Sequence, residues 1–305
     1  MIRFKNLTKR YEDGKGIFDF SFEVEEGEVL GLVGDKGSGK STALRVLMGF
    51  ETVTKGRCAI NGKDCSQWAR SLHQIIGYLP DKISLPPMMT GREFLRSNAA
   101  MRGVKNLEYM FELAYRLELD VDVKIGKMTS AEVQKTGIVC ALLHNPKVVL
   151  LDNPFRNLDK RTGSALVDII LEEKEKGKMI LLTTDSVDAA DLTCDRVVLL
   201  EKGVVVYIGD VENMRENMYR DYLIQFANGR AAMKFTNESF QVKRLKDRNL
   251  VVTVQGALLP LLQALSRYPV TSIEPLPLPL KETFLHIYDM GGRSDDKFTD
   301  TETGF

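Results

Sequence analysis

Short apolar runs alternate with amphipathic segments along most of the first two hundred residues of the chain. Four of these runs consist almost entirely of branched or other apolar residues, at positions 29–33, 148–151, 180–183 and 197–200. Such runs are typical of strands that are buried on both faces of a parallel sheet. Between them lie segments with apolar side chains at helical spacing, at positions 41–48, 107–117 and 166–175. This alternation predicts an α/β fold built in layers.

An antiparallel piece is expected beside the parallel strands. Asn61-Gly62 follows the apolar residues 58–60, and Asn-Gly is a strong signal for the two-residue turn of a hairpin. The predicted sheet is therefore mixed, with an antiparallel β subdomain attached to it.

A change of pattern in the last third of the chain predicts a second, smaller unit. Residues 214–225 are expected to form a connecting helix, and residues 234–253 are strand-like and locally basic. Residues 258–265 have the spacing of a short amphipathic helix. We therefore expect a small α+β accessory domain over residues 214–290. Residues 291–305 contain hardly any apolar side chain, which predicts a disordered tail.

The composition excludes several classes of function. The 305 residues include 42 basic and 42 acidic side chains, and this balance argues against a protein that acts by coating nucleic acid. The longest apolar stretch, residues 250–265, is interrupted by polar residues and is shorter than the ~18 residues that span a bilayer. No signal peptide is visible at the N-terminus. The scattered cysteines form no Cys-x-x-Cys pair and are expected to be small buried side chains: Cys58, Cys65, Cys140 and Cys194.

The most specific motif is a glycine-rich loop between a predicted strand and a predicted helix. It fits the pattern G-x-x-x-x-G-K-[ST], in which glycines allow backbone N–H groups to surround phosphate oxygens. The N-terminus of the following helix adds a positive potential. Lys40 would reach the β- and γ-phosphates, and the Ser41 hydroxyl would bind Mg²⁺. The loop predicts a site for a nucleoside triphosphate, formed by Gly34, Asp35, Lys36, Gly37, Ser38, Gly39, Lys40, Ser41 and Thr42.

An acidic residue at the end of a second strand fits beside this loop. Asp152 follows the apolar residues 148–151, so the fold would place it at the carboxyl edge of the sheet, near the Mg²⁺. A lone Asp after a strand is usually a turn former or a helix cap. Its occurrence together with the phosphate loop favours the metal-binding role.

In this order, the motifs resemble those of ATP-binding cassette (ABC) ATPases, the nucleotide-binding subunits of membrane transporters. The resemblance covers residues 1–213, with a helical subdomain at about residues 85–145. It implies that Tyr11 stacks on adenine and that Asp81 lies at the Q-loop, while Leu158-Asp159 matches the D-loop. It also implies ATP and Mg²⁺ as ligands.

The resemblance further implies partners and a location. The residues past 230, which end in residues 279–285, resemble the C-terminal extension found in drug and sodium exporters of this family. Such a subunit would act with a separate integral membrane subunit, as a homodimer or heterodimer of ATP-binding subunits. Its expected location is the cytoplasmic face of the cell membrane.

One departure from the family pattern concerns the signature Leu-Ser-Gly-Gly-Gln, which falls on residues 128–132. In the family this element binds ATP held by the partner subunit, which would assign Thr129, Ser130 and Ala131 to nucleotide binding. The same residues read Thr-x-x-Glu, the pattern of a helix capping box, which would place the Glu132 carboxylate at the positive helix end. We favour capping over nucleotide binding.

Two further departures concern the hydrolysis of ATP. Asn153 stands where the family has a Glu that polarises the attacking water, and an amide cannot accept the proton. Asp185 stands where the family has a His that contacts the γ-phosphate, and its charge would repel that group. Losing a general base typically costs ~10²–10⁴ in rate. The sequence therefore predicts a subunit that binds Mg·ATP but is impaired in hydrolysis.

Two alternatives remain open. Asp81 or Asp185 would serve as a relocated base in a working ATPase. Asp81 is also expected to bind Mg²⁺, together with Ser41 and Asp152. Alternatively, the chain is an interaction protein outside transport that uses the nucleotide only as a switch. Whether the chain is an enzyme depends on which of these readings holds.

Overall fold

A computed structural model describes residues 1–213, 219–246 and 248–276 of the chain. The chain divides into two compact units, Met1–Val211 and Glu212–Phe305. Each unit has its own hydrophobic core.

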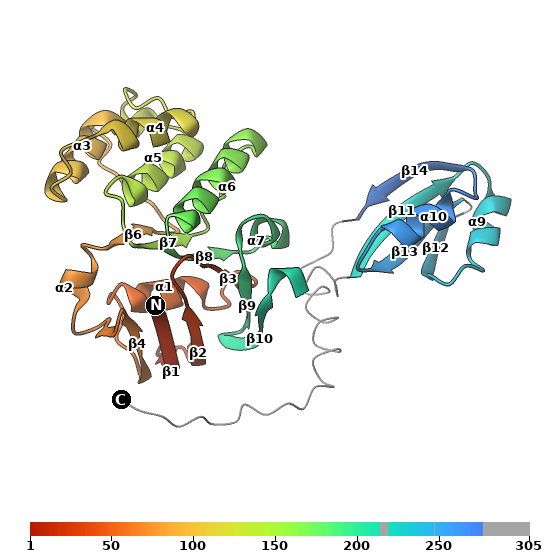
Figure 1. The fold of residues 1–305 in the computed structure, drawn as a ribbon, viewed down its shortest axis with the longest axis horizontal. Coiled ribbons are helices and arrows are strands. Elements are labelled where there is room, and N and C mark those ends of the chain that lie inside the picture. Colours follow the sequence, from red (N-terminus) through yellow and green to blue (C-terminus); the bar gives the residue numbers. More distant parts are fainter. Residues whose placement is uncertain (214–218, 247, 277–305) are drawn as a thin grey trace. The chain divides into compact units, whose positions relative to one another are not determined.

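A ten-stranded mixed sheet forms the centre of the first unit (Figure 1). Its order is β5-β4-β1-β2-β10-β9-β3-β8-β7-β6. The five strands from β9 to β6 run parallel, whereas β1 pairs antiparallel with both β2 and β4. The strands are β1 Ile2–Arg10, β2 Gly16–Val24, β3 Val29–Val33, β4 Lys55–Ile60, β5 Lys63–Asp64, β6 Ile76–Leu79, β7 Val148–Asp152, β8 Met179–Thr184, β9 Arg196–Glu201 and β10 Val204–Asp210. The predicted α/β class and its attached antiparallel piece are confirmed.

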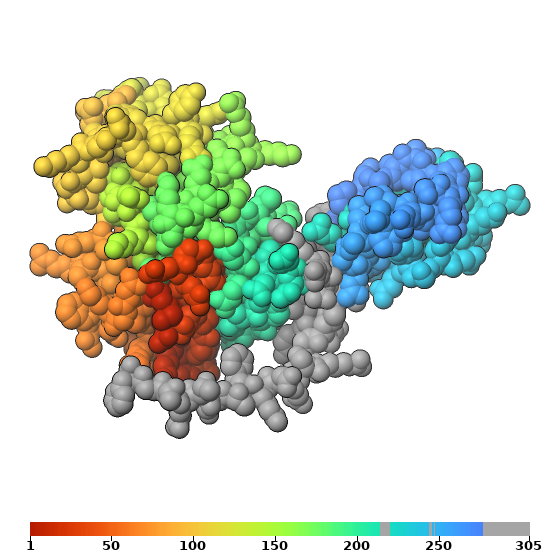
Figure 2. Space-filling model, viewed as in Figure 1, coloured from red at the N-terminus to blue at the C-terminus, as the bar shows by residue number. Residues whose placement is uncertain are grey.

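Helices connect and cover these strands. Those between β6 and β7, coloured from orange-yellow to yellow-green, form one lobe of the first unit in Figure 2. The helices of this unit are α1 Lys40–Leu47, α2 Ala69–Leu72, α3 Gly91–Met101, α4 Glu108–Arg116, the 3₁₀ turn Ile125–Lys127, α5 Ser130–Leu142, α6 Lys160–Glu175 and α7 Val187–Thr193. The expected helices at 41–48, 107–117 and 166–175 all coincide with these elements.

The candidate site is built at the ends of the buried strands of this sheet. Every residue of β3, β7 and β8 is buried, as expected for parallel strands covered on both faces. Helix α1 packs Ala43, Leu44 and Leu47 into the same core as these strands. Since burial of each of the two leucines stabilises the fold by roughly 1.5–3 kcal/mol, the helix that follows the phosphate loop is firmly anchored.

The second unit is a four-stranded antiparallel sheet with two helices. Its strand order is β12-β13-β11-β14, and its chain order β-α-β-β-α-β is that of two interlocked split βαβ motifs. Its elements are β11 Tyr219–Phe226, α9 Gly229–Phe235, β12 Gln241–Lys246, β13 Asn249–Gln255, α10 Leu259–Leu265 and β14 Val270–Pro275. The expected helix at 258–265 matches α10.

The connecting helix expected at 214–225 is wrong where the structure describes it. Strand β11 occupies this place and pairs with β13 and β14. Its alternate residues Tyr222, Ile224 and Phe226 are buried in the core, so the period is two and a strand results. The strand-like stretch at 234–253 is likewise partly wrong, because Lys234 and Phe235 end helix α9.

Several other expectations fall wholly or partly outside the described residues. Residues 214–218, the last part of the exporter-like extension (279–285) and the tail 291–305 are among them. Among the described residues, no helix is long and apolar enough to cross a bilayer.

The four thiols are free, and three of them, Cys58, Cys65 and Cys194, are buried as expected. Cys140 is only half-buried. Burial raises the pKa of Cys140 to about 11 and that of Cys194 to about 12, so both remain protonated at neutral pH.

Candidate functional site

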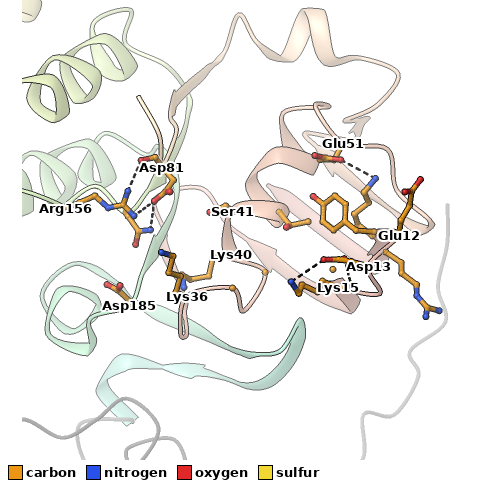
Figure 3. A pocket seen from close by; sticks show the side chains of 18 residues that line it. Glu12, Asp13, Lys15, Lys36, Lys40, Ser41, Glu51, Asp81, Arg156 and Asp185 are labelled. Atoms are coloured by element: carbon orange, nitrogen blue, oxygen red, sulfur yellow. Dashed lines mark hydrogen bonds and ion pairs between the residues drawn. The ribbon is translucent and has the colours of Figure 1, made fainter. Parts of the chain in front are cut away.

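A cavity of about 1010 Å³ opens in the first unit, beside the phosphate loop and the ends of β7 and β8. Figure 3 shows Asp81, Arg156, Asp185 and Lys40 on one side of it and Glu12, Asp13, Lys15 and Glu51 on the other. The predicted residues that line it are Tyr11, Lys36, Gly37, Gly39, Lys40, Ser41, Thr42, Asp81, Asn153 and Asp185. The structure therefore gathers most of the candidate site around one cavity.

The phosphate loop curves between β3 and α1 with two glycines in the left-handed region. Gly37 has a φ of 89° and Gly39 a φ of 105°. A Cβ at Gly39 would lie 2.5 Å from Cγ2 of Ile17, so no other residue fits there without a shift. Gly39 also caps α1, and no side chain satisfies the first turn of this helix. Its backbone N–H groups remain available to an anion.

Lys40 lies against the loop that precedes it. Its Nζ donates hydrogen bonds to the carbonyl oxygens of Gly34 (2.5 Å) and Asp35 (2.9 Å). Burial lowers the pKa of the Lys40 ammonium, while Asp185 and Asp152 oppose this shift by favouring the charged form. The cation predicted to contact the phosphates is therefore held at the loop itself.

Ser38 supplies a test of whether this loop suits a phosphate. Its Oγ is buried and has no hydrogen-bond partner among the described residues. Its carbonyl oxygen accepts a hydrogen bond from the Gly203 backbone (3.0 Å), which fixes the loop. A buried polar atom without a partner costs stability, and a phosphate oxygen would satisfy it. The loop fits the predicted triphosphate.

Asp152 and Ser41 have the chemistry of a Mg²⁺ site. Asp152 ends β7 with 2% of its surface exposed, and its Oδ1 accepts a hydrogen bond from the Thr183 hydroxyl (2.6 Å). Burial raises the pKa of Asp152, and hydrogen bonds from Thr183 and Ser41 oppose that shift. Ser41 and Asp152 therefore present adjacent hard oxygen donors, as Mg²⁺ requires. No group of three or more His, Cys, Asp or Glu within the described part of the chain suits a metal, so phosphate oxygens would complete the shell.

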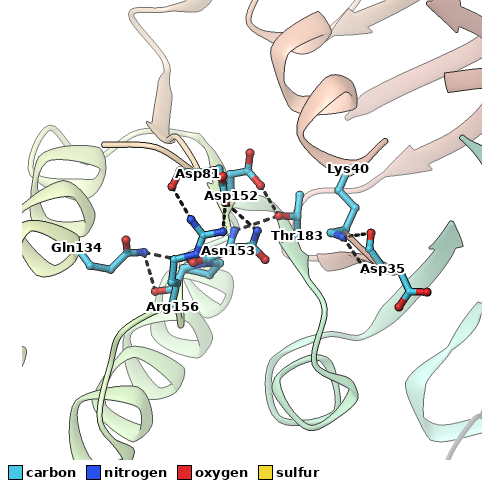
Figure 4. A network of polar contacts seen from close by, with 10 residues as sticks. Asp35, Lys40, Asp81, Gln134, Asp152, Asn153, Arg156 and Thr183 are labelled. Carbon is cyan, nitrogen blue, oxygen red and sulfur yellow. Dashed lines mark hydrogen bonds and ion pairs between the residues drawn. The ribbon is translucent and has the colours of Figure 1, made fainter. Parts of the chain in front are cut away.

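Asp81 is tied to the turn that follows β7. Its Oδ1 accepts a hydrogen bond from Nδ2 of Asn153 (3.0 Å) and forms an ion pair with Nη2 of Arg156 (2.5 Å). Nη1 of Arg156 also donates to the Asp81 carbonyl oxygen (3.1 Å). Figure 4 shows these side chains converging in front of Asp152. The Asn153 side chain is therefore a hydrogen-bond donor at the place where the sequence led us to expect a missing base.

The backbone of Asn153 is fixed from two sides. Its N–H lies within hydrogen-bond distance of Oγ1 (3.0 Å) and of the carbonyl oxygen (3.2 Å) of Thr183. On the other side, Nε2 of Gln134 on α5 donates to the carbonyl oxygens of Asn153 (3.2 Å) and Pro154 (3.1 Å). The turn after β7 is therefore connected to both β8 and the helical lobe.

Asp185 and Tyr11 lie at different ends of the cavity. Asp185 is exposed beyond the end of β8, and it is the strongest of the carboxylates that favour the charged form of Lys40. Tyr11 follows β1 and is half-buried, with Nζ of Lys9 5.0 Å from its ring centroid. The distribution of these side chains matches a nucleotide with its base near Tyr11 and its phosphates near Lys40.

The signature-like residues are not part of this cavity. Thr129 caps helix α5, with its Oγ1 accepting from the Glu132 backbone (3.3 Å) and its N–H donating to the Glu132 carboxylate (2.7 Å). The hydrogen bond from the Thr129 N–H lowers the pKa of Glu132. The predicted capping box is confirmed, and Thr129, Ser130 and Ala131 do not line the cavity.

Sequence reasoning missed several residues of the site, among them Arg156, Gln134 and Thr183. Arg156 lies between the motif residues Asp152 and Asp159, and a charged side chain in that turn was a signal that could have been used. Gln134 and Thr183 contact the same turn through its backbone. Such contacts leave no trace in the sequence.

Comparisons with known proteins agree on one family. A family model described as "ABC transporter" matches residues 17–156. An uncharacterised ABC transporter ATP-binding protein of Methanocaldococcus jannaschii is 36% identical over 228 residues, which cover 73% of this chain and 82% of that protein.

Solved structures give the same result for the fold. One, described as the ATP-binding subunit of an ABC transporter, is 30% identical with a TM-score of 0.66, covering 70% of this chain and 92% of its own. Another, described as a dimeric bacterial ABC transporter cassette, is 24% identical with a TM-score of 0.63, covering 69% and 99%. At that identity, the second structure supports the fold alone.

Proposed function

Because the chain belongs to the family of ABC transporter ATP-binding proteins, we propose that it binds Mg·ATP and hydrolyses it only slowly. Binding of the nucleotide, more than its turnover, would then regulate the transporter. Three features support ATP binding: the glycines of the phosphate loop, the unsatisfied Ser38 Oγ, and the pairing of Ser41 with Asp152. Mg²⁺ would supply charge neutralisation of the phosphates.

The observation that carries the proposal of slow hydrolysis is the hydrogen bond from Asn153 to Asp81. In the family, the residue at this position accepts a proton from the attacking water. Here the amide donates to Oδ1 of Asp81, and that same oxygen is also paired with Arg156. Asp81, one of the two carboxylates that could replace the missing base, is therefore already hydrogen-bonded by the Asn153 amide. Accepting a proton from water at this oxygen would compete with the hydrogen bond from Asn153.

A working ATPase is the second candidate, and one observation favours it. Asp185 is exposed and lines the cavity, so it is able to approach a water molecule there. Against this, its negative charge faces the phosphate end of the cavity, where like charges repel.

We propose further that the chain is an exporter-type subunit at the cytoplasmic face of the membrane, acting with a separate membrane-spanning subunit. Proteins of this family work with membrane subunits and form dimers, and one of the structural neighbours is a dimer. Two identical chains would bring together two sites that each carry Asn153 and Asp185. A heterodimer with a subunit that has an intact site is therefore the arrangement we favour.

The proposal is tested by measuring nucleotide binding and phosphate release on the purified protein. The wild type is expected to bind a fluorescent ATP analogue, and Lys40→Ala to weaken this binding at least ~10-fold because a charged hydrogen-bond donor is lost. Asn153→Glu restores a general base and is expected to raise phosphate release at least ~10-fold.

Other outcomes decide between the alternatives. Two results together would establish the working ATPase instead. The wild type would turn over at about 1 s⁻¹ or faster, which is ordinary for enzymes, and Asp185→Ala would abolish this activity. Failure of the wild type to bind ATP would refute the proposal. Purification of the protein from its native membrane with an integral membrane subunit attached would exclude an interaction protein outside transport.

A further inference from the structure

Arg156 lies in the nucleotide cavity, and the function proposed above gives it no contact with the nucleotide. It follows β7 by four residues, and 43% of its side-chain surface is exposed. It lines the same cavity as Lys40 and Asp185 (Figure 3). A guanidinium group at such a place is a candidate for binding a negatively charged ligand.

Within the described parts of the chain, the Arg156 guanidinium forms its ion pair and its hydrogen bond with Asp81. The ion pair is with Oδ1 (2.5 Å), and the hydrogen bond is to the carbonyl oxygen (3.1 Å). The two side chains are 43% and 26% exposed, and ion pairs accessible to water contribute little to stability. Arg156 is therefore able to exchange its partner at little cost.

The negative charges around the cavity favour such an exchange, because a phosphate bound there needs a cation beside it. Asp81, Asp152 and Asp185 all surround the place where the last phosphate of a triphosphate would lie. Lys40 is bound to the carbonyl oxygens of the loop. Figure 4 shows Arg156 and Lys40 on opposite sides of the pair formed by Asp152 and Thr183. A phosphate bound between them would contact Lys40 on one side. For it to contact a cation on the other side as well, Arg156 must take part.

We propose that Arg156 binds the terminal phosphate of ATP and thereby makes the site prefer ATP over ADP. This inference rests on the proposed function, because it concerns the same cavity. Without the nucleotide, Asp81 holds the guanidinium at the edge of the cavity. When ATP is bound, Arg156 leaves Asp81 and forms two parallel N–H···O bonds with the phosphate, a geometry that guanidinium groups match well.

Asn153 has a place in this exchange. Its Nδ2 continues to donate to Oδ1 of Asp81 after Arg156 has left, so the carboxylate keeps one partner. Arg156 also offsets the negative charge of Asp185 at the phosphate end. The contacts of Asp81, Asn153 and Arg156 therefore change together when ATP binds.

The test compares the affinities for Mg·ATP and Mg·ADP, measured by calorimetric titration of the full-length protein. Arg156→Gln is expected to weaken the binding of ATP about 10- to 100-fold, the loss typical of a hydrogen-bonded charge. The affinity for ADP is expected to change less than about 2-fold, since ADP lacks the phosphate in question. The matched control is Arg161→Gln, because Arg161 is 85% exposed, pairs with Glu118 and does not line the cavity. It is expected to leave both affinities unchanged.

The inference is overturned if Arg156→Gln weakens both nucleotides equally or weakens neither. If thermal unfolding shows that this variant does not fold, Arg156→Lys takes its place. The lysine keeps the charge but loses the paired geometry, so ATP affinity is expected to fall about 3- to 10-fold with ADP affinity unchanged. Wild-type affinities for both nucleotides in Arg156→Lys would overturn the inference as well. A wild type that binds neither nucleotide refutes the proposed function itself, whereas equal effects on both nucleotides refute only the role of Arg156.

Discussion

Four carboxylates and three cations lie around the phosphate end of the cavity, although the chain as a whole has no net charge. The acidic residues are Asp35, Asp81, Asp152 and Asp185, and the basic residues are Lys36, Lys40 and Arg156. The most deeply buried of these carboxylates is Asp152, whose pKa is raised by burial. A charged group held in this way destabilises the fold until a cation arrives. At the scale of single residues, the site is therefore built for a positively charged ligand beside Ser41 and for a phosphate beside Lys40.

Asp152→Asn tests this view of the buried carboxylate. A raised folded-state pKa means a contribution to stability that is present at low pH and is lost as pH rises through that pKa. The amide carries no charge, so at neutral pH the variant without nucleotide is expected to melt about 2–4 °C higher than the wild type, for a gain of ~1 kcal/mol. The difference is expected to shrink on acidification towards pH 4. Thermal unfolding at several pH values measures it.

The same variant is expected to lose the effect of Mg²⁺ on ATP affinity, because a metal ligand is gone. Asp168→Asn is the control: Asp168 is exposed on α6, and its change is expected to stay within about 0.5 kcal/mol. A lower melting temperature for Asp152→Asn than for the wild type at neutral pH would contradict this account of the buried charge.

At the scale of elements, the local runs of apolar residues were sufficient to predict the buried strands of the sheet. The runs at 29–33 and 148–151 are strands because continuous apolar residues suit a sheet covered on both faces. Strand β11 was missed because only alternate residues face its core, and its polar positions gave the segment a mixed appearance. Asp81 and Asn153 were each assigned to the site, but their contacts with one another and with Arg156 were missed, because Asp81 is 72 residues from Asn153 and 75 from Arg156 in the sequence. Pairings between side chains from distant segments follow from the topology and have no local signal.

Two helices of the lobe between β6 and β7 begin with the same motif, and this allows a matched test of capping. Thr90 and Glu93 form a capping box on α3, as Thr129 and Glu132 do on α5. Thr90→Ala and Thr129→Ala are each expected to lower the free energy of unfolding by ~1 kcal/mol, because each removes an acceptor for a backbone N–H. Denaturant titration measures both. Neither variant is expected to change ATP affinity. If Thr129→Ala alone weakened ATP binding or ATP-dependent dimer formation, the residues at this helix start would contact nucleotide as the family signature does.

At the scale of the whole molecule, two units with separate cores divide the described chain, and the nucleotide cavity belongs wholly to the first. The first unit has the fold of ABC cassettes, and its phosphate loop keeps the features needed to bind a triphosphate. Under the proposed function, Asn153 and Asp185 are expected to slow the cleavage of ATP, whereas the loop itself is intact. Together these features are the ones expected of a subunit that stays occupied by ATP.

The central claim is therefore tested most directly by identifying the nucleotide that the protein holds. Purified protein is incubated with Mg²⁺ and radiolabelled ATP, separated from free nucleotide, and its bound nucleotide is extracted over time and identified by chromatography. A missing base that lowers an ordinary turnover of about 1 s⁻¹ by ~10²–10⁴ leaves a rate of about 10⁻²–10⁻⁴ s⁻¹, and hence a half-life of about a minute or longer. We predict that the bound nucleotide is still mainly ATP after a minute. Complete conversion to ADP within seconds, or no retained nucleotide at all, would contradict the claim.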